Sequence, residues 1–303
     1  MPSSVSPVAT IIIPTLCNLV RADSLLRSIR SVSMSCLDPV SILVCINGDR
    51  VDERLLSSIS KLPNVTCIRI AAASVVMARA AGRRAVSTRF FGFLDDDDEL
   101  LEGAITRHLL NFEAFPSLDV SVCNGFKQFG GNYELLLDST AGIDSDPLRA
   151  LFHRNYLASC GGLFREATVG SEFFEELPPF GQWTMLAFSL AMSGKQIRMV
   201  SDPGYVIHDS PVSQSKGIAY KANYLTLFER MRQMQPPDDI IEILHNKTSD
   251  TLHDLSVEML TAGNLREAVR LHVKSLRPIY GLRYLSYTRR LVMHAFTRVG
   301  LKP

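Results

Sequence analysis

The chain has 303 residues, of which 46% are hydrophobic and 21% are charged, and its formal net charge is +1. This composition is typical of a soluble globular protein, and the length suits one α/β domain with an appendage. No apolar run reaches the roughly 18–20 residues of a membrane-spanning helix, and the start lacks the features of a signal peptide. The six cysteines form no C-x-x-C pair, so we expect buried thiols in a reducing cytoplasm rather than disulfides or a zinc site.

The first half of the chain alternates short apolar runs with helical patterns. The expected strands are 9–14, 41–46, 65–70 and 90–94, and the expected helices are 20–32 and 74–86. This alternation predicts parallel βαβ units whose strands are covered on both faces. Ligands of such sheets bind at the carboxyl ends of the strands, which here carry Pro14, Thr15, Asn47 and the aspartates of 95–98.

The middle of the chain is less regular, and the last part is helical. We expect strands at 118–123 and 157–164, a hairpin at 125–138, a helix at 182–193, and short strands at 197–200 and 205–208. From about residue 215 the pattern predicts helices at 220–233, 237–246, 249–261, 265–276 and 282–299. The predicted domains are therefore residues 1–215 and 216–303.

Four consecutive aspartates, Asp95 to Asp98, follow an apolar strand. Adjacent carboxylates repel one another and gain nothing from packing, whereas Mg²⁺ and Mn²⁺ prefer carboxylate and phosphate oxygens. Alternation at a strand end predicts that Asp95 and Asp97 point one way and Asp96 and Asp98 the other. The alternatives are a solvated acidic turn, or acids at the N-terminus of a helix that starts near Glu99.

The sequence resembles the inverting glycosyltransferases of family 2. The matching segments, in order over roughly residues 9–215, are Ile12–Thr15, Ala78–Gly82, Phe93–Asp98, Gly161–Arg165, Phe174–Leu177, Trp183 and His208. Each segment alone is a weak signal, whereas the series is specific. The resemblance implies an α/β chain of the GT-A fold (Rossmann-like, with a mostly parallel sheet flanked by helices) and a C-terminal helical extension.

The same resemblance implies a role for individual residues. The donor-binding set would be Pro14, Thr15 and Asn47 at the base, Arg79 at the pyrophosphate, Asp95 and Asp96 at the ribose or sugar, and Gly161 and Gly162 where the backbone approaches the sugar. Mn²⁺ or Mg²⁺ would be held by Asp97, Asp95 and His208. From the residues alone, each role has a structural alternative. Arg79 could be a solvated arginine, His208 a structural histidine, and Gly161 and Gly162 a bulge in an edge strand.

One position departs from the family pattern. Members usually carry an acidic pair before the tryptophan, and its carboxylate deprotonates the acceptor hydroxyl, whereas this chain has Gly181 and Gln182. Neither residue has useful proton affinity near neutral pH. The substitute bases we consider are Glu175, Glu176 and Asp209, for which a role as ordinary surface acids is the alternative.

These features predict a metal-dependent enzyme that adds one sugar from a nucleotide-sugar donor to a glycan or lipid-linked acceptor. Direct displacement with inversion needs no covalent intermediate. The Gln-x-x-Arg-Trp motif and the membrane helices of processive synthases are missing, which favours single addition. The alternative is a non-catalytic or weakly active nucleotide-sugar-binding protein on the same scaffold, because of Gly181 and Gln182.

The C-terminal part is basic. Residues 264–303 contain nine Lys or Arg and one acid, Glu267, which gives +8 and leaves −7 for the rest of a chain with net charge +1. Residues 282–301 mix arginines with apolar residues, which suits an amphipathic helix on the inner face of a membrane. The alternative is a helix packed on the protein with its arginines in solvent. No nucleic-acid reader motif is present, and nothing in the sequence fixes an oligomeric state.

Overall fold

The computed structural model describes residues 6–208, 218–277 and 279–298. The chain divides into two compact units, Met1–Pro211 and Val212–Pro303. The predicted boundary at residue 215 lies outside the described residues.

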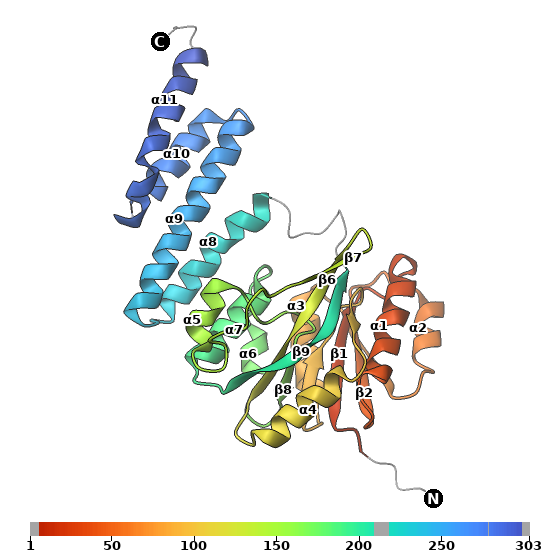
Figure 1. Ribbon diagram of the computed structural model, residues 1–303. Coiled ribbons are helices and arrows are strands. Elements are labelled where there is room, and N and C mark those ends of the chain that lie inside the picture. The colour runs from red at the N-terminus through yellow and green to blue at the C-terminus, as the bar shows by residue number, and fades with distance from the viewer. Residues whose placement is uncertain (1–5, 209–217, 278, 299–303) are drawn as a thin grey trace, which may run out of the picture. The chain divides into compact units, whose positions relative to one another are not determined.

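The first unit begins with the predicted parallel βαβ units. Its strands β1 (Ala9–Thr15), β2 (Val40–Asn47), β3 (Val65–Ile70) and β4 (Phe90–Phe93) pair in parallel in the order β3-β2-β1-β4. Figure 1 shows β1 and β2 side by side. The helices between them are η1 (Leu19–Arg21), α1 (Ala22–Met34), α2 (Glu53–Ile59) and α3 (Val75–Ala85). Asp52 and Ser74 cap α2 and α3 by accepting bonds from backbone N–H groups, as short polar side chains do at helix starts. Helix α2 was not predicted.

The rest of the sheet is mixed in direction. Strand β8 (Gly162–Arg165) lies antiparallel between β4 and β6 (Val120–Phe129), and β9 (Ile197–His208) runs parallel to β6. Strand β5 (Glu99–Leu100) pairs with β9, and β7 (Asn132–Leu135) forms the predicted hairpin with β6. The two short strands predicted at 197–200 and 205–208 are one strand.

Both faces of the sheet are covered, as alternation along β1 requires. All seven residues of β1 are buried. Ile11 and Ile13 pack in one cluster with residues of α1 and α4 (Ala104–Ala114), whereas Ile12 faces α3, where its Cγ2 would lie 2.5 Å from a Cβ placed on Gly82. Only glycine therefore lets α3 approach the strand this closely.

An aromatic cluster packs on the face of the sheet that α3 covers. Phe91 and Phe164 stack with centroids 5.1 Å apart, and Phe93 lies 5.2 Å from Phe174 and 5.5 Å from Trp183. Phe174 and Trp183 belong to α6 (Glu172–Glu175) and α7 (Gln182–Met192), which follow α5 (Pro147–His153). The cluster fixes the start of α7, and with it Gln182, relative to β4.

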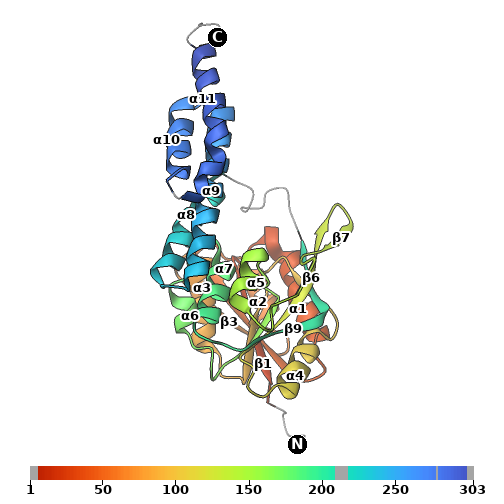
Figure 2. The same ribbon diagram turned by 60° about the vertical axis from the view of Figure 1, so that its left-hand side comes forward.

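The second unit is helical. It contains α8 (Ile218–Gln233), α9 (Asp238–Thr261), α10 (Leu265–Ser275), η3 (Ile279–Tyr284) and α11 (Leu285–Arg298). Figure 2 shows α10 and α11 alongside α9. The helices predicted at 237–246 and 249–261 are one helix, because no proline or glycine interrupts residues 238–261. Within the described residues, no helix is both long enough and apolar enough to cross a bilayer.

Candidate active site

The carboxyl ends of β1, β2 and β4 meet at one edge of the sheet. Because these strands are parallel neighbours, Thr15, Asn47 and the acidic run after Phe93 lie at the same edge. The contact is direct: the Thr15 hydroxyl donates to Asp96 Oδ2 at 2.6 Å, and its oxygen accepts from the Cys17 N–H at 3.0 Å. The predicted convergence of strand ends is thus present.

The four aspartates form a turn and do not continue the strand. Strand β4 ends at Phe93, and the Asp98 N–H donates to the carbonyl of Asp95 at 3.1 Å. The Ser28 hydroxyl, from α1, holds the Asp98 carbonyl at 2.6 Å. The prediction that Asp95 and Asp97 point one way and Asp96 and Asp98 the other assumed a strand end. That assumption is wrong, because the residues form a turn.

The turn gives the four carboxylates unequal access to solvent. The side chains of Asp95 and Asp97 are 30% and 41% exposed, whereas that of Asp96 is 13% exposed. Asp98 is buried, and it accepts from the His208 backbone N–H at 3.2 Å and the Ser159 hydroxyl at 3.4 Å. Asp95 and Asp97 are thus the two carboxylates best placed to meet a ligand.

Burial changes the acidity of the two inner aspartates. It raises the pKa of Asp96 from 3.8 to about 6, against the lowering effects of the Thr15 hydrogen bond and the Arg21 charge. Burial also raises the pKa of Asp98 well above its ordinary value, and the charges of Asp95 and Asp97 add to the rise. Asp96 and Asp98 therefore carry less negative charge than two fully exposed aspartates would.

Arg79 is buried beside this turn. It lies on α3, is 5% exposed, and donates from Nη1 to Gln182 Oε1 at 2.5 Å and from Nη2 to Asp95. Its guanidinium carbon lies 4.8 Å from the centre of the Trp183 ring, which is within cation–π range. The alternative of a solvated arginine is wrong, since one guanidinium joins α3, the acidic turn and α7.

Arg21, which the sequence analysis missed, is the second arginine at the turn. Its Nη1 donates to Asp97 and lies 3.5 Å from Asp96 Oδ1. It ends the short helix η1, far from the aspartates in sequence, and no matching motif contains it. Arg21 places a half-exposed positive charge where a cation bound to Asp97 would lie.

Asn47 has an unsatisfied acceptor. The residue is 6% exposed at the end of β2, and its Oδ1 is buried with no hydrogen-bond partner in the described part of the chain. A buried carbonyl oxygen without a partner is unfavourable by roughly 1–3 kcal/mol. A ligand that donates a hydrogen bond, as many nucleobase edges do, would relieve this.

His208 is paired with a carboxylate. Its Nε2 lies 2.7 Å from Glu99 Oε1, which also accepts from Arg27 Nε at 3.1 Å. Its backbone N–H holds Asp98, so the end of β9 is fixed against the acidic turn. The metal role of His208 stays a prediction.

The two glycines before and within β8 serve close packing. A Cβ on Gly161 would lie 2.9 Å from the Tyr205 ring, and one on Gly162 would lie 2.9 Å from Leu157. The protein's own side chains thus fill the space over both glycines. Their predicted approach to a sugar stays a prediction.

Of the three substitute bases, the structure describes Glu175 and Glu176, and both are exposed. Glu175 is exposed on α6 and contacts Arg84 at 3.5 Å and the Ser171 hydroxyl at 3.1 Å, and Glu176 is exposed just beyond that helix. Asp209 lies outside the described residues. Gly181 and Gln182 stand at the position where the family pattern has an acidic pair. Gly181 caps the start of α7 with φ 67°, and the Gln182 side chain accepts a hydrogen bond from Arg79. All three base assignments stay predictions.

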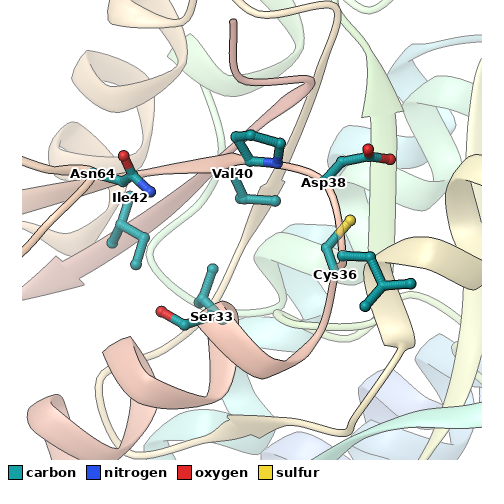
Figure 3. A pocket seen from close by; sticks show the side chains of 9 residues that line it. Ser33, Cys36, Asp38, Val40, Ile42 and Asn64 are labelled. Atoms are coloured by element: carbon teal, nitrogen blue, oxygen red, sulfur yellow. The ribbon is translucent and has the colours of Figure 1, made fainter. Parts of the chain in front are cut away.

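Two cavities lie at different ends of the sheet. Figure 3 shows one of about 230 Å³ lined by the end of α1, the loop to β2 and Asn64, at the amino ends of β2 and β3. The other, of about 370 Å³, is lined by residues that include Glu99, Tyr133 and His208. Of these two cavities, the second lies beside the acidic turn.

Comparison with known proteins identifies the family. The sequence profile of Glycosyl transferase family 2 matches residues 10–166, slightly more than half of the chain. The chain belongs to glycosyl transferase family 2. It is a glycosyltransferase with the GT-A fold, as the sequence resemblance predicted.

Solved structures agree with this fold. The chain is similar to residues 1–349 of S. aureus TarS, with a TM-score of 0.63, 12% identity, and coverage of 96% of this chain and 91% of that chain. For the same TarS segment in complex with UDP-GlcNAc, the TM-score is 0.61 at 11% identity, with 97% and 92% coverage. No curated protein sequence matches the chain.

Proposed function

We propose that this glycosyltransferase transfers a single sugar, with inversion, from a nucleotide-diphosphate sugar to a glycan or lipid-linked acceptor, and that it uses Mn²⁺ or Mg²⁺. The observation that carries the proposal is the acidic turn, in which the buried Arg79 donates to Asp95 while the carboxylates of Asp95 and Asp97 are accessible to solvent. A guanidinium suits phosphate and carboxylates suit a hard cation. The TarS complexes with UDP-GlcNAc and with UDP support a uridine nucleotide as the first donor to test.

The acidic turn offers carboxylate oxygens, which are the ligands that Mn²⁺ and Mg²⁺ prefer. Among the described residues, no group of three or more His, Cys, Asp or Glu side chains is arranged to hold a metal by itself. Asp97 and Asp95 would supply two oxygen ligands, and the diphosphate of the donor would supply others. Bound there, the cation would offset the negative charge that develops on the departing nucleoside diphosphate.

The chain's own residues would bind and orient the donor. Asn47 would accept a hydrogen bond from the base through its unpaired Oδ1, and Thr15, anchored to Asp96, would lie in the same pocket. Arg79 would add positive charge beside the pyrophosphate, with its position fixed by Gln182 and the Trp183 ring. In the transfer step an acceptor oxygen forms a bond to the anomeric carbon while the bond from that carbon to the nucleoside diphosphate breaks. The proton of the acceptor hydroxyl would pass to a carboxylate base, for which Glu175, Glu176 and Asp209 are the predicted candidates.

A second candidate function is donor binding without efficient turnover. The observation that favours it is the Gln182 carboxamide, which stands at the family's acidic position and accepts from Arg79. An amide does not take up the acceptor proton near neutral pH. Under this alternative the strand ends would still bind a nucleotide-sugar, and Glu175, Glu176 and Asp209 would have no catalytic part.

One assay separates the two functions. The protein is incubated with Mn²⁺ and a panel of UDP-, GDP- and dTDP-sugars, and slow hydrolysis to nucleoside diphosphate is followed by chromatography. The proposal expects one donor to be hydrolysed and Asp97→Ala to abolish the reaction. A donor that binds without hydrolysis, together with unchanged cellular glycans in an Asp97→Ala strain, would establish the binding function instead.

We also propose that the second unit contacts a membrane surface. Leu285, Val292 and Met293 of α11 are 53%, 46% and 39% exposed, and Arg289 and Arg290 are exposed beside them. Leu291, an apolar residue of the same helix, is 3% exposed, because it packs against other residues of this unit. Sedimentation with vesicles of anionic lipid tests the proposal: binding by the wild type and loss of it in Arg289→Glu/Arg290→Glu is expected, and equal sedimentation of both would contradict it.

A further inference from the structure

The cavity of about 370 Å³ beside the acidic turn has a wall of aromatic and aliphatic side chains. Its lining residues are Glu99, Leu100, Leu101, Phe126, Tyr133, Val206 and His208. They come from β5, the loop after it, the β6–β7 hairpin and β9, all within the first unit. The donor-binding residues predicted from the sequence do not line this cavity, whereas His208, which was predicted as a metal ligand, does.

The aromatic part of the wall is open to solvent. The Tyr133 side chain lies on β7 and the residue is 56% exposed, and its ring meets that of Phe126 with centroids 6.3 Å apart and planes at 89°. The two residues lie on the paired strands β6 and β7 of the hairpin, where the register partner of Tyr133 is Gln128 and that of Phe126 is Leu135. An exposed tyrosine face offers an apolar platform with a hydroxyl at its rim.

The polar part of the wall presents a fixed carboxylate. Glu99 Oε1 accepts from His208 at 2.7 Å and from Arg27 at 3.1 Å, whereas no hydrogen bond from a described residue reaches its Oε2. The Glu99 side chain is 32% exposed. Two positive or polar partners therefore hold this carboxylate in place while one oxygen stays available for a hydroxyl group.

The cavity adjoins the acidic turn. Glu99 follows Asp98 directly, and the His208 backbone N–H is bonded to Asp98. A flat ring with apolar C–H faces and several hydroxyl groups matches both parts of this wall, since one face covers an aromatic side chain while the hydroxyls reach a carboxylate. A sugar ring has this chemistry.

We propose that the cavity is an acceptor subsite, in which a neutral sugar ring of the acceptor glycan packs on Tyr133 and donates a hydroxyl hydrogen bond to Glu99. The proposal deepens the proposed function and rests on it for the identity of the occupant as acceptor. Tyr133 and Glu99 are here binding residues that select and orient the acceptor. The cavity's place next to the donor residues would bring that ring to the anomeric carbon of the donor.

The test compares two exposed aromatic residues on one hairpin. Phe129 is 59% exposed at the end of β6 and does not line the cavity, so Phe129→Ala is matched to Tyr133→Ala in exposure and lost area. The probes are the methyl glycosides of glucose, galactose and N-acetylglucosamine, observed by saturation-transfer NMR on the full chain. Titration calorimetry with UDP and Mn²⁺ provides a separate measure of the donor site.

The expected result is that at least one methyl glycoside binds to the wild type and to Phe129→Ala, and that Tyr133→Ala binds it roughly tenfold more weakly. Tyr133→Phe, which keeps the ring, should bind more tightly than Tyr133→Ala, and Glu99→Gln should weaken binding as well. UDP affinity should be retained in Tyr133→Ala. If glycoside binding is equal in Tyr133→Ala and Phe129→Ala, or if no glycoside binds to the wild type, the subsite is refuted.

The outcomes also distinguish an acceptor subsite from a part of the donor site. Loss of UDP affinity and glycoside affinity together in Tyr133→Ala would assign the cavity to the donor and overturn the acceptor assignment. Failure of the wild type to bind any nucleotide would refute the proposed function, yet selective glycoside binding through Tyr133 would then still establish a sugar site. The two failures are therefore distinguishable.

Discussion

The carboxamide oxygen of Gln182 accepts a hydrogen bond of 2.5 Å from the buried guanidinium of Arg79. Both residues are less than 10% exposed, and the same guanidinium reaches Asp95 and the Trp183 ring. The position at which related enzymes carry an acid is therefore used here to fix an arginine. Because a neutral amide leaves the charge of Arg79 intact, more of that charge acts on a bound diphosphate than if a carboxylate stood there.

Replacing Gln182 by glutamate should weaken the binding of UDP with Mn²⁺. A carboxylate beside Arg79 would neutralise part of its charge, and we expect an affinity loss of about tenfold, or ~1.4 kcal/mol. Titration calorimetry measures it. Gln182→Met, which removes the acceptor but adds no charge, is the control and should lose less. Tighter UDP binding by Gln182→Glu would show that the arginine does not act on the diphosphate.

Arg79 should contribute to stability as well as to binding. Arg79→Ala leaves Gln182 and Asp95 without their shared donor, and since Asp95 is partly exposed we expect a loss of about 2 kcal/mol in the free energy of unfolding. Urea denaturation measures the change. Arg84→Ala, on the same helix, removes an exposed ion pair to Glu175 and should change stability by less than about 1 kcal/mol. Equal effects of the two variants would contradict the central role given to Arg79.

Arg21 should compete with a cation for Asp97. Its guanidinium is bonded to Asp97 and lies near Asp96, so Arg21→Ala leaves the turn more negative. We expect the variant to be less stable without metal and to gain more in Tm than the wild type when Mn²⁺ is added. Arg30→Ala, an exposed arginine on α1, is the control. A Mn²⁺ response that is the same in wild type, Arg21→Ala and Arg30→Ala would argue against a cation at Asp97.

His108 should make the fold sensitive to acid. Burial, with a smaller effect of Arg107, lowers the pKa of His108 from 6.5 to about 3, and its Nδ1 lies 2.8 Å from the Ser121 hydroxyl. The unfolded state therefore binds a proton between pH 6.5 and 3 that the folded state does not, so stability falls as the pH falls through this range. The contribution changes by up to about 1.4 kcal/mol per pH unit.

Urea denaturation of the wild type and His108→Gln at several pH values between 7 and 4 tests this acid sensitivity. The variant should lose stability less steeply below pH 6.5, whatever its stability at pH 7. His153→Gln removes an exposed histidine and should keep the wild-type slope. Identical slopes in His108→Gln and the wild type would mean that another group carries the acid sensitivity.

Much of the fold could be predicted because its signals are local. The apolar runs identified the parallel strands within one or two residues, and parallel pairing then brought Thr15, Asn47 and the acidic run to one edge. The helical second unit was predicted for the same reason. Helix α9 was divided in two because periodicity alone does not reveal continuity, although no helix breaker occurs within it.

The predictions that failed concern contacts between residues that are far apart in the sequence. Arg21 and Asp97 are 76 positions apart, and nothing near Arg21 marks it as a partner of the acidic run. The turn that buries Asp98 is held by Ser28 from α1 and by the His208 backbone, so strand alternation gave the wrong reason for the order of the carboxylates. Gln182 was recognised as a departure from the family, but its bond to Arg79 required the packing of α7 against α3.

The central claim is that the acidic turn and Arg79 bind a nucleotide diphosphate together with a divalent cation. Titration calorimetry of UDP into the full chain, with Mn²⁺ and with EDTA, tests it most directly in the wild type and in Asp97→Ala. We predict measurable binding by the wild type that weakens at least tenfold in EDTA, and little effect of Mn²⁺ in Asp97→Ala. UDP binding that is equally strong in EDTA, or equally dependent on Mn²⁺ in Asp97→Ala, would contradict the claim.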